Sequence, residues 1–266
     1  KTTYHGEINW NDLDIKNIHL TAEGLRFKEG IMYGHAQQIS FREKTGFTVH
    51  EMSGRTRVGQ GRAIIEDIKI KDDWSDLKLP LFMMSYDNIK AFQDFIALVK
   101  LDAEIAESLL DFKTLSYFSP SLSENNLKLD VTGSMSGHID DFTFTDINIE
   151  SHYGGFKGKA SGRISGLPEI EDTYLDARLS NFSLTSKGLS HFISQWSDGQ
   201  KVDLGRFASG TTFRLNGRCA GLMNALKVSA DIRSGLGSAK ADVRMDNLVA
   251  KGSDPEISGS ISTEDL

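Results

Sequence analysis

A passage that occurs twice, with glycines at matching positions, is the sequence feature that most constrains the fold. The first copy spans residues 127 to 145 and the second spans 213 to 229. The matching glycines are Gly133 and Gly137 in the first copy and Gly217 and Gly221 in the second. Each pair is 84 residues apart (217 minus 133), and so are Phe142 and Leu226. Repeated strand pairs that each carry one apolar face must stack to hide it, so the repeat predicts a stacked β array.

Apolar and polar residues alternate along most of the chain, which is the period of a strand with one apolar face. Gly, Asn, Asp and Ser separate the alternating runs at short intervals, as an antiparallel meander requires. Where the alternation is broken, we predict that one strand ends and another begins. Such breaks separate Phe142/Phe144 from Ile147/Ile149, and Leu175/Ala177/Leu179 from Phe182/Leu184. The pattern predicts a mostly β chain of short antiparallel strands.

Two or three short helices are expected to interrupt the strands. The segment 87–97 places Ile89, Phe92, Phe95 and Ile96 on one helical face, with Asp87 or Ser85 as the cap. A second helix is predicted over 187–196, capped by Thr185 or Ser186, and a helical turn over 115–118 is ended by Pro120. Helices of this length could plug an end or a mouth of the sheet stack.

Composition excludes several classes of function. The net charge of −7 argues against a nucleic-acid partner, which needs a clustered positive surface. The single cysteine, Cys219, excludes an internal disulfide framework. No stretch approaches the ~20 apolar residues of a membrane helix. The chain starts without Met or a signal-type segment, which indicates a fragment of a longer protein.

Motifs that would carry catalysis or metal binding are absent from the sequence. The seven histidines are scattered, and none has the spacing of a helical zinc site. The best ligand cluster, His138 with Asp140 and Asp141, lies in a predicted hairpin where Asp is an ordinary turn residue. Gly59-Gln-Gly61 and Gly235-Leu-Gly237 lack a strand-to-helix context and are interpreted as turns or bulges. We therefore expect no catalytic residue, no metal and no cofactor.

The repeated glycines match the Gly-x-x-x-Gly spacing of membrane-helix dimers, but their alternating, polar surroundings do not fit that interpretation. In strands, such glycines mark bulges, bends or the close approach of another chain or a ligand.

The apolar face has two interpretations as well. It could be a core sealed by a facing sheet, which the residues alone favour, or the lining of a curved sheet left partly open as a groove for acyl chains.

Five sequence passages, in this order, resemble the large TamB-like proteins of Bacteroidetes-type bacteria, within the wider AsmA-like group. The passages are Glu43-Lys-Thr-Gly-Phe-Thr-Val-His, Ile65-Glu-Asp-Ile-Lys-Ile-Lys-Asp, Leu115-Ser-Tyr-Phe-Ser-Pro-Ser-Leu, Val131-Thr-Gly-Ser-Met-Ser-Gly-His-Ile-Asp-Asp-Phe and Gly166-Leu-Pro-Glu-Ile-Glu-Asp-Thr-Tyr-Leu-Asp. The resemblance covers about Asn9 to Ile261.

The resemblance implies an elongated, curved, taco-shaped antiparallel sheet with an apolar concave face. It also implies a periplasmic protein that is anchored in the inner membrane and takes part in phospholipid transport and outer-membrane protein assembly. The implied partners are phospholipid acyl chains and an outer-membrane barrel protein of the assembly machinery. The family has no known catalytic residues, so none is carried over.

On this basis, the apolar members of the repeat strands are expected to line a lipid groove. They are Leu127, Leu129, Val131, Phe142, Phe144, Phe213, Leu215, Leu226 and Val228. We expect a first segment over 1–120, a first β-repeat over 121–200 and a truncated second repeat over 201–266. A gain of roughly 0.8 kcal/mol per buried CH₂ would hold an acyl chain without specific side-chain chemistry.

Three functional classes follow from the sequence. A lipid-conducting β scaffold is the first, and a structural or adhesive β-repeat protein, or an outer-membrane assembly factor, with a closed core is the second. The third is an enzyme on a β-solenoid, which would need exposed paired carboxylates such as Asp140/Asp141 or Asp72/Asp73 in a cleft.

Overall fold

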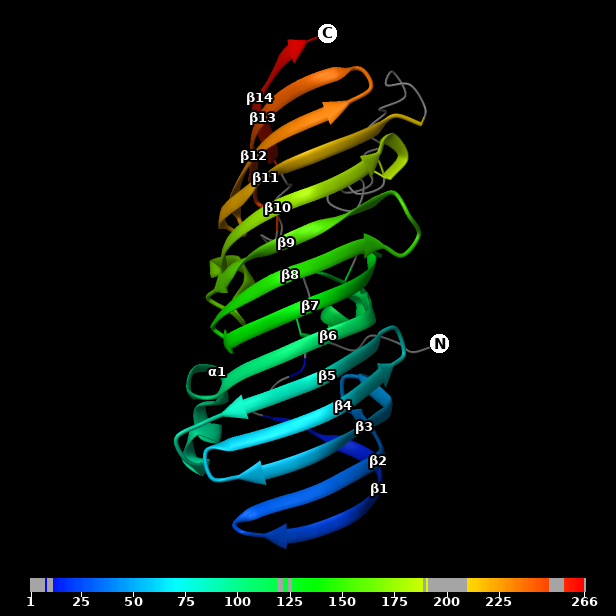
Figure 1. Ribbon diagram of the computed structural model, residues 1–266, viewed down its shortest axis with the longest axis vertical. Helices are drawn as coiled ribbons and strands as arrows, with labels where there is room; N and C mark the ends of the chain where they lie inside the picture. The colour runs from blue at the N-terminus through cyan, green and yellow to red at the C-terminus, as the bar shows by residue number, and fades with distance from the viewer. Residues whose placement is uncertain are drawn as a thin grey trace.

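A computed structural model shows one antiparallel sheet of fourteen strands, in which every strand pairs with its neighbours in the sequence (Figure 1). The structure describes residues 8, 12–118, 122–123, 126–188, 190, 210–248 and 256–265. The strands are β1 (Ile15–Lys28), β2 (Ile31–Glu43), β3 (Thr48–Gly59), β4 (Arg62–Asp72), β5 (Asp76–Ser85), β6 (Lys100–Asp111), β7 (Lys128–His138), β8 (Asp141–Ser151), β9 (Phe156–Ser165), β10 (Tyr174–Thr185), β11 (Thr212–Leu222), β12 (Ala225–Ser234), β13 (Gly237–Asp246) and β14 (Glu256–Asp265).

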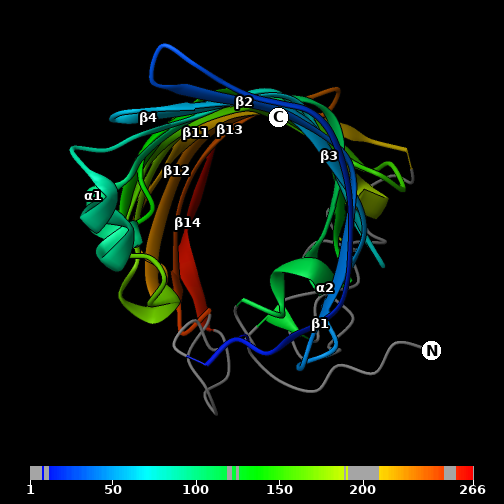
Figure 2. The ribbon, with the colours of Figure 1, turned by 90° about the horizontal axis from the view of Figure 1, so that it is seen from below.

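The sheet is curved into a trough (Figure 2). Each strand runs round the curve, and the strands follow one another along the long axis of the molecule. Within the described residues, strands pack only on their sheet neighbours, and no second sheet faces the first. The prediction of a mostly β, curved antiparallel sheet with a few short helices is confirmed. The sheet also continues without interruption across the boundaries expected at 120 and 200.

Breaks in the alternation are bulges inside long strands, which corrects the prediction of separate strands. Phe142 to Ile149 belong to the single strand β8, and Leu175 to Leu184 belong to β10. The residues at the breaks, Asp146 and Asn181, have φ values of +48° and +53°. Asn and Asp tolerate this left-handed conformation better than other side chains. The extra residue in each bulge returns the following apolar side chains to the same face of the sheet.

The helical segments differ in detail from the predictions. Between β5 and β6 a 3₁₀ helix, η1 (Ile89–Asp94), is followed by one α-helical turn, α1 (Phe95–Leu98). The cap of η1 is Asn88, whose side chain accepts a hydrogen bond from the N–H of Lys90. The predicted caps were Asp87 or Ser85. The helical turn expected over 115–118 is α2 (Phe112–Leu115), which begins three residues earlier.

Two further helical segments lie in loops at the ends of β10. A 3₁₀ turn, η3 (Ile170–Asp172), precedes β10. The helix predicted over 187–196 is helical at 186–188 and at 190, and the rest of that prediction lies outside the described residues. The N–H of Gly188 donates to the Thr185 hydroxyl at 3.0 Å, so Thr185 acts as a cap there.

Gly137 and Gly221 of the repeat occupy equivalent places in β7 and β11, opposite Phe142 and Leu226. Gly137 and Gly221 have φ values of +140° and +138°. A Cβ on Gly137 would lie 2.4 Å from the Asp141 carbonyl oxygen, and a Cβ on Gly217 would lie 2.4 Å from the Ser229 carbonyl oxygen. Real Cβ atoms do not approach so closely, so at these positions the neighbouring strand backbone leaves space only for glycine.

A cluster of buried polar groups lies at one rim of the trough, beneath α2. This rim cluster consists of Asp72, Ser75, Asp111 and Thr114, which are each at least 93% buried. The Thr114 hydroxyl donates to Asp72 at 2.8 Å, the Ser75 hydroxyl donates to Thr114 at 2.7 Å, and the Asp111 N–H donates to Ser75 at 2.9 Å. Figure 2 shows α2 lying on the inner side of the curve.

Candidate functional site: the apolar floor of the trough

One row of directly opposed residues crosses all fourteen strands on the inner face without a polar side chain. It consists of Phe27, Met32, Val58, Ala63, Met84, Leu101, Gly137, Phe142, Ile164, Leu175, Gly221, Leu226, Met245 and Ile257, from β1 to β14 in order. Adjacent strands are ~4.8 Å apart, so the row is about 60 Å long.

A second row lies two residues further along the strands and crosses β2 to β14. It consists of Gly34, Thr56, Ile65, Phe82, Ala103, Met135, Phe144, Gly162, Ala177, Cys219, Val228, Val243 and Gly259. The Thr56 hydroxyl is its one polar group, and it donates to the Gly34 carbonyl oxygen. The two rows together form a continuous surface without charge, which we call the apolar floor.

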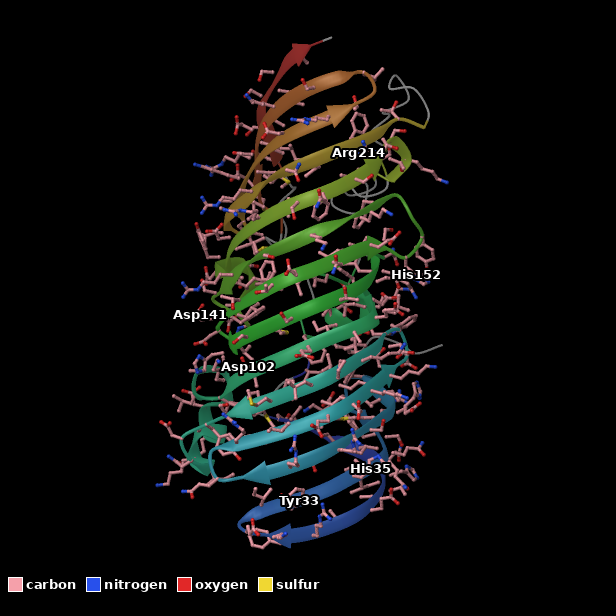
Figure 3. All side chains as sticks on the ribbon, viewed as in Figure 1. Tyr33, His35, Asp102, Asp141, His152 and Arg214 are labelled. Carbon is pink, nitrogen blue, oxygen red and sulfur yellow. The ribbon has the colours of Figure 1, made fainter. Side chains whose placement is uncertain are left out.

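Residues one position away along the strands point to the outer face, and most of them are polar. The row that starts at Arg26 and Tyr33 continues through Asp102, Thr143 and Arg163 to Ser258. Tyr33 and Asp102 lie on the outer side of the curve in Figure 3. This face also carries ion pairs, such as the one between Arg163 and Asp141. The sheet is therefore apolar inside the trough and polar outside.

Most large side chains of the apolar floor are only half-buried. Phe142, Phe144 and Ile164 keep part of their surface accessible, although they are flanked by strands on both sides. A core sealed by a second sheet would bury such residues almost fully. The floor residues of the edge strands are more exposed still, with Phe27 at 76% and Ile257 at 59%. The surface of the trough can therefore be reached by another apolar molecule.

The residues predicted to line a groove fall on this face. Leu129, Val131, Phe142, Phe144, Phe213, Leu215, Leu226 and Val228 lie on the inner side of β7, β8, β11 and β12. Leu127 differs from the other eight. It precedes β7 at the rim, is buried, and accepts the N–H of Phe112 through its carbonyl oxygen.

The sequence-based set missed the floor residues of β1 to β6, β9, β10, β13 and β14. Met84, Leu101 and Met245 belong to the first row as fully as Phe142 does. The alternation in these strands would have identified them, because it has the same period as in the repeat. The glycine repeat lies in β7, β8, β11 and β12 only, so it predicts only a part of the apolar floor.

The only cysteine lies on the apolar floor. Cys219 is buried between Ala177 and Val228, and burial raises the pKa of its thiol to about 11. The thiolate is the reactive form of cysteine, so the folded protein holds this group in its unreactive state at neutral pH. Its contribution here is that of a small apolar side chain.

Charged groups at the acid pairs Asp140/Asp141 and Asp72/Asp73 form ion pairs and structural contacts. Asp141 pairs with Arg163, which holds the pKa of the Asp141 carboxyl below its usual value. Asp72 belongs to the rim cluster, and Asp73 pairs with His50 at 2.6 Å. Across the described part of the chain, no three His, Cys, Asp or Glu residues are arranged to hold a metal ion.

A search for membrane-spanning helices in the described residues finds none that is long and apolar enough. The sequence matches no family model, and neither a curated protein nor a solved structure is significantly similar to it.

Proposed function

We propose that the apolar floor binds the acyl chains of phospholipids and that the chain is a scaffold for phospholipid transport between two membranes. The observation that carries this proposal is the row of apolar residues that crosses all fourteen strands and that no second sheet of the described residues covers. Two properties support it. The surface is about 60 Å long and uncharged, and its side chains are half-buried instead of sealed.

A surface of this kind needs no catalytic group to move a lipid. Burial of an acyl chain contributes roughly 0.8 kcal/mol per CH₂, and this gain is similar at every point along a uniform floor. Neighbouring positions therefore have similar free energies, and an acyl chain meets no charged side chain as it passes from one strand to the next. The phospholipid headgroup would remain toward the open side of the trough.

The cellular setting of the proposal comes from the resemblance described above. A TamB-like or AsmA-like protein would place this trough in the periplasm, with an inner-membrane anchor outside the present sequence and an outer-membrane barrel protein as a partner. A role in outer-membrane protein assembly is part of the same proposal. The structural or adhesive alternative differs in one measurable respect, because it requires no bound lipid.

The proposal is tested by native mass spectrometry of the protein purified from a bacterial envelope. Wild-type protein is expected to carry phospholipid. Phe144→Asp places a charge on the floor and should abolish the bound lipid, because it buries a carboxylate against acyl chains. The matched control is Thr143→Asp, which adds the same charge on the outer face of the same strand and should retain the lipid.

Circular dichroism of both variants shows whether the β sheet persists. A folded, lipid-free wild-type protein would contradict the proposal and favour the structural alternative. Equal loss of lipid in Phe144→Asp and Thr143→Asp would also contradict it, because the effect would then not depend on the face.

A further inference from the structure

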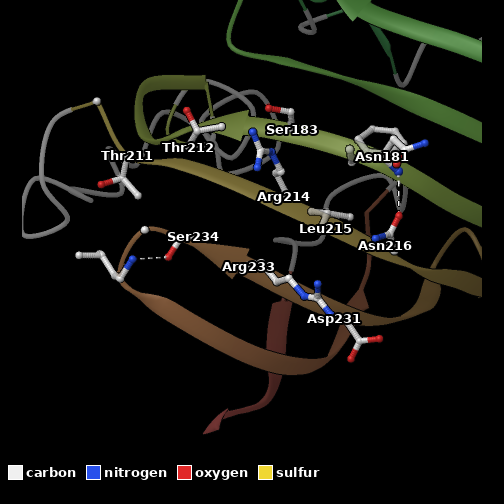
Figure 4. A pocket seen from close by; sticks show the side chains of 14 residues that line it. Asn181, Ser183, Thr211, Thr212, Arg214, Leu215, Asn216, Asp231, Arg233 and Ser234 are labelled. Carbon is white, nitrogen blue, oxygen red and sulfur yellow. Dashed lines mark hydrogen bonds between the residues drawn. The ribbon is translucent and has the colours of Figure 1, made fainter. Parts of the chain in front are cut away.

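A pocket of about 980 Å³ lies against β10, β11 and β12 (Figure 4). Arg214 and Arg233 line it together with Asn181, Ser183, Asn216 and Asp231. Arg214 lies on the outer side of the sheet in Figure 3. These polar residues alternate with inner-face residues such as Leu215 and Ile232, so their side chains belong to the face opposite the apolar floor.

Arg214 and Arg233 are directly opposite each other on adjacent antiparallel strands. Side chains in such positions have Cβ atoms about 5 Å apart, and like charges there destabilise the sheet. Both side chains are exposed, and among the described residues neither forms an ion pair. Asp231 is the one carboxylate among the described residues that line the pocket, and it lies opposite Lys240 and Asn216.

A second arginine pair on the same face is built differently. Arg178 and Arg218 are also directly opposed, on β10 and β11. Arg218, however, forms two hydrogen bonds with the carboxylate of Asp176, at 2.8 and 2.6 Å. The protein thus compensates one cross-strand arginine pair with an internal anion and leaves the other pair facing a pocket.

Neutral donors and the surrounding charge favour an anion in this pocket. The Asn181 N–H donates to Asn216 Oδ1 at 2.8 Å, which leaves the Asn216 amide nitrogen as a donor. The Ser183 hydroxyl is a further donor. Strands β9 to β12 together carry eight basic and two acidic residues, in a chain whose net charge is −7.

We propose that this pocket binds a phosphate group, with the guanidinium groups of Arg214 and Arg233 on either side of its oxygens. Arginine is suited to this role because its planar fork donates two parallel hydrogen bonds to a phosphate. A bound phosphate would supply for this pair the negative charge that Asp176 supplies for Arg218. The proposal is independent of acyl-chain binding, because the pocket and the apolar floor lie on opposite faces.

The test is thermal unfolding in sodium phosphate and in sodium chloride at equal ionic strength. Phosphate should raise the Tm of the wild-type protein in a saturable way, since it binds only the folded state. Arg214→Gln and Arg233→Gln should each weaken the apparent phosphate affinity by about tenfold or more, because each removes charge-assisted hydrogen bonds. In chloride, both variants should be at least as stable as wild type, since the like-charge repulsion is gone.

Arg178→Gln is the matched control, because it removes one arginine from the compensated pair on the same face. It should leave the phosphate affinity within about twofold of wild type, since it changes no group in the pocket. The absence of a saturable phosphate effect in wild-type protein would overturn the proposal. An equal loss of affinity in Arg178→Gln would do so too, because binding would then reflect only the net charge of the surface.

A second experiment distinguishes two sources of the phosphate group, a lipid headgroup and a soluble phosphate compound. Vesicles of phosphatidylcholine with one part in four of phosphatidylglycerol are compared with vesicles of phosphatidylcholine alone, by co-sedimentation. Binding to the mixed vesicles that both Arg→Gln variants lose would identify a lipid headgroup. Stabilisation by inorganic phosphate without such vesicle binding would identify a soluble phosphate compound.

Discussion

The apolar floor and the rim cluster use the same sheet in opposite ways. At the rim, α2 covers the ends of β4 to β7, and Asp72, Ser75, Asp111 and Thr114 are almost fully buried. On the floor, Phe142 and Phe144 lie in the centre of the sheet but keep part of their surface accessible. The rim is therefore built as a conventional protein core, whereas the floor resembles one half of a core, and no second sheet of the described residues supplies the other half.

We infer from this difference that the rim stabilises the fold and that the floor serves binding. Single-layer sheets gain little from side-chain burial between layers, so covered regions contribute a large share of their stability. Substitutions at the rim should thus unfold the protein, while substitutions on the floor should mainly change what the surface binds. The predictions below test that contrast, from the largest expected effect to the smallest.

Aromatic truncation should separate the two regions most clearly. Tyr117 is 97% buried next to the rim cluster, and its ring lies 5.4 Å from that of Phe47. Tyr117→Ala should lower the free energy of unfolding by about 4 kcal/mol, the usual cost of an aromatic cavity. Phe144→Ala should cost about 1 to 2 kcal/mol, because the Phe144 side chain is half-buried and leaves no closed cavity. Urea denaturation measures both values, and equal losses would contradict the contrast.

Removal of a buried charge partner should have the next largest effect. Lys128 pairs at 2.9 Å with Asp111, whose side chain is 1% exposed. Lys128→Met should cost about 3 kcal/mol, because it leaves a buried carboxylate without its counter-charge. The control is Lys100→Met, which breaks an exposed pair with Asp102 and should cost less than about 1 kcal/mol. Similar losses in the two variants, again from urea denaturation, would show that the rim pair is effectively solvated.

Close strand packing on the floor predicts an intermediate effect for Gly137→Ala. The new Cβ would lie 2.4 Å from the Asp141 carbonyl oxygen, at a φ of +140°. We expect a loss of about 2 kcal/mol from the backbone strain. Gly235→Ala, where a Cβ meets nothing within 4 Å, should change stability by no more than about 0.5 kcal/mol. Calorimetric unfolding of the two variants tests this, and a neutral Gly137→Ala would be inconsistent with the strand spacing described.

The smallest effect concerns pH. Burial raises the pKa of Asp72, against the opposing hydrogen bonds from Ser75, Trp74 and Thr114. The charged form therefore costs stability at pH values above the raised pKa, and this cost is lost as the pH falls through that pKa. Relative to Asp72→Asn, the wild-type protein should become more stable between neutral pH and about pH 4. Unfolding free energies of both proteins across this range test the sign, and a constant difference would argue against a raised pKa.

The fold was largely predictable because its main signals are local. Alternation with a period of two places apolar residues on one face, and the repeat of Gly133 and Gly137 at Gly217 and Gly221 indicates equivalent strands. The error in strand number came from the bulges. Asp146 and Asn181 shift the alternation by one residue without ending the strand, so an Asn or Asp directly before a shifted apolar run is a better sign of a bulge than of a turn.

The candidate site was less predictable, because contacts between residues distant in the sequence decide whether the apolar floor is covered. Nothing in the alternation of Phe142 and Phe144 states whether a second sheet covers them. The rim cluster shows the same limit, since Asp72 and its partner Thr114 are 42 residues apart. The sequence leaves Asp72/Asp73 open as a paired carboxylate, whereas in the structure Asp72 accepts hydrogen bonds from a buried turn and from Thr114 of α2.

Site-specific photocrosslinking tests most directly whether the apolar floor contacts lipid. A photoreactive phenylalanine analogue is placed at Phe144, on the floor, or at Thr143, on the outer face of the same strand, in protein produced in a bacterial envelope. After illumination, mass spectrometry identifies the adducts. We predict a phospholipid adduct at position 144 and none at 143. The absence of an adduct at 144, or equal adducts at both positions in folded protein, would contradict a lipid-binding floor.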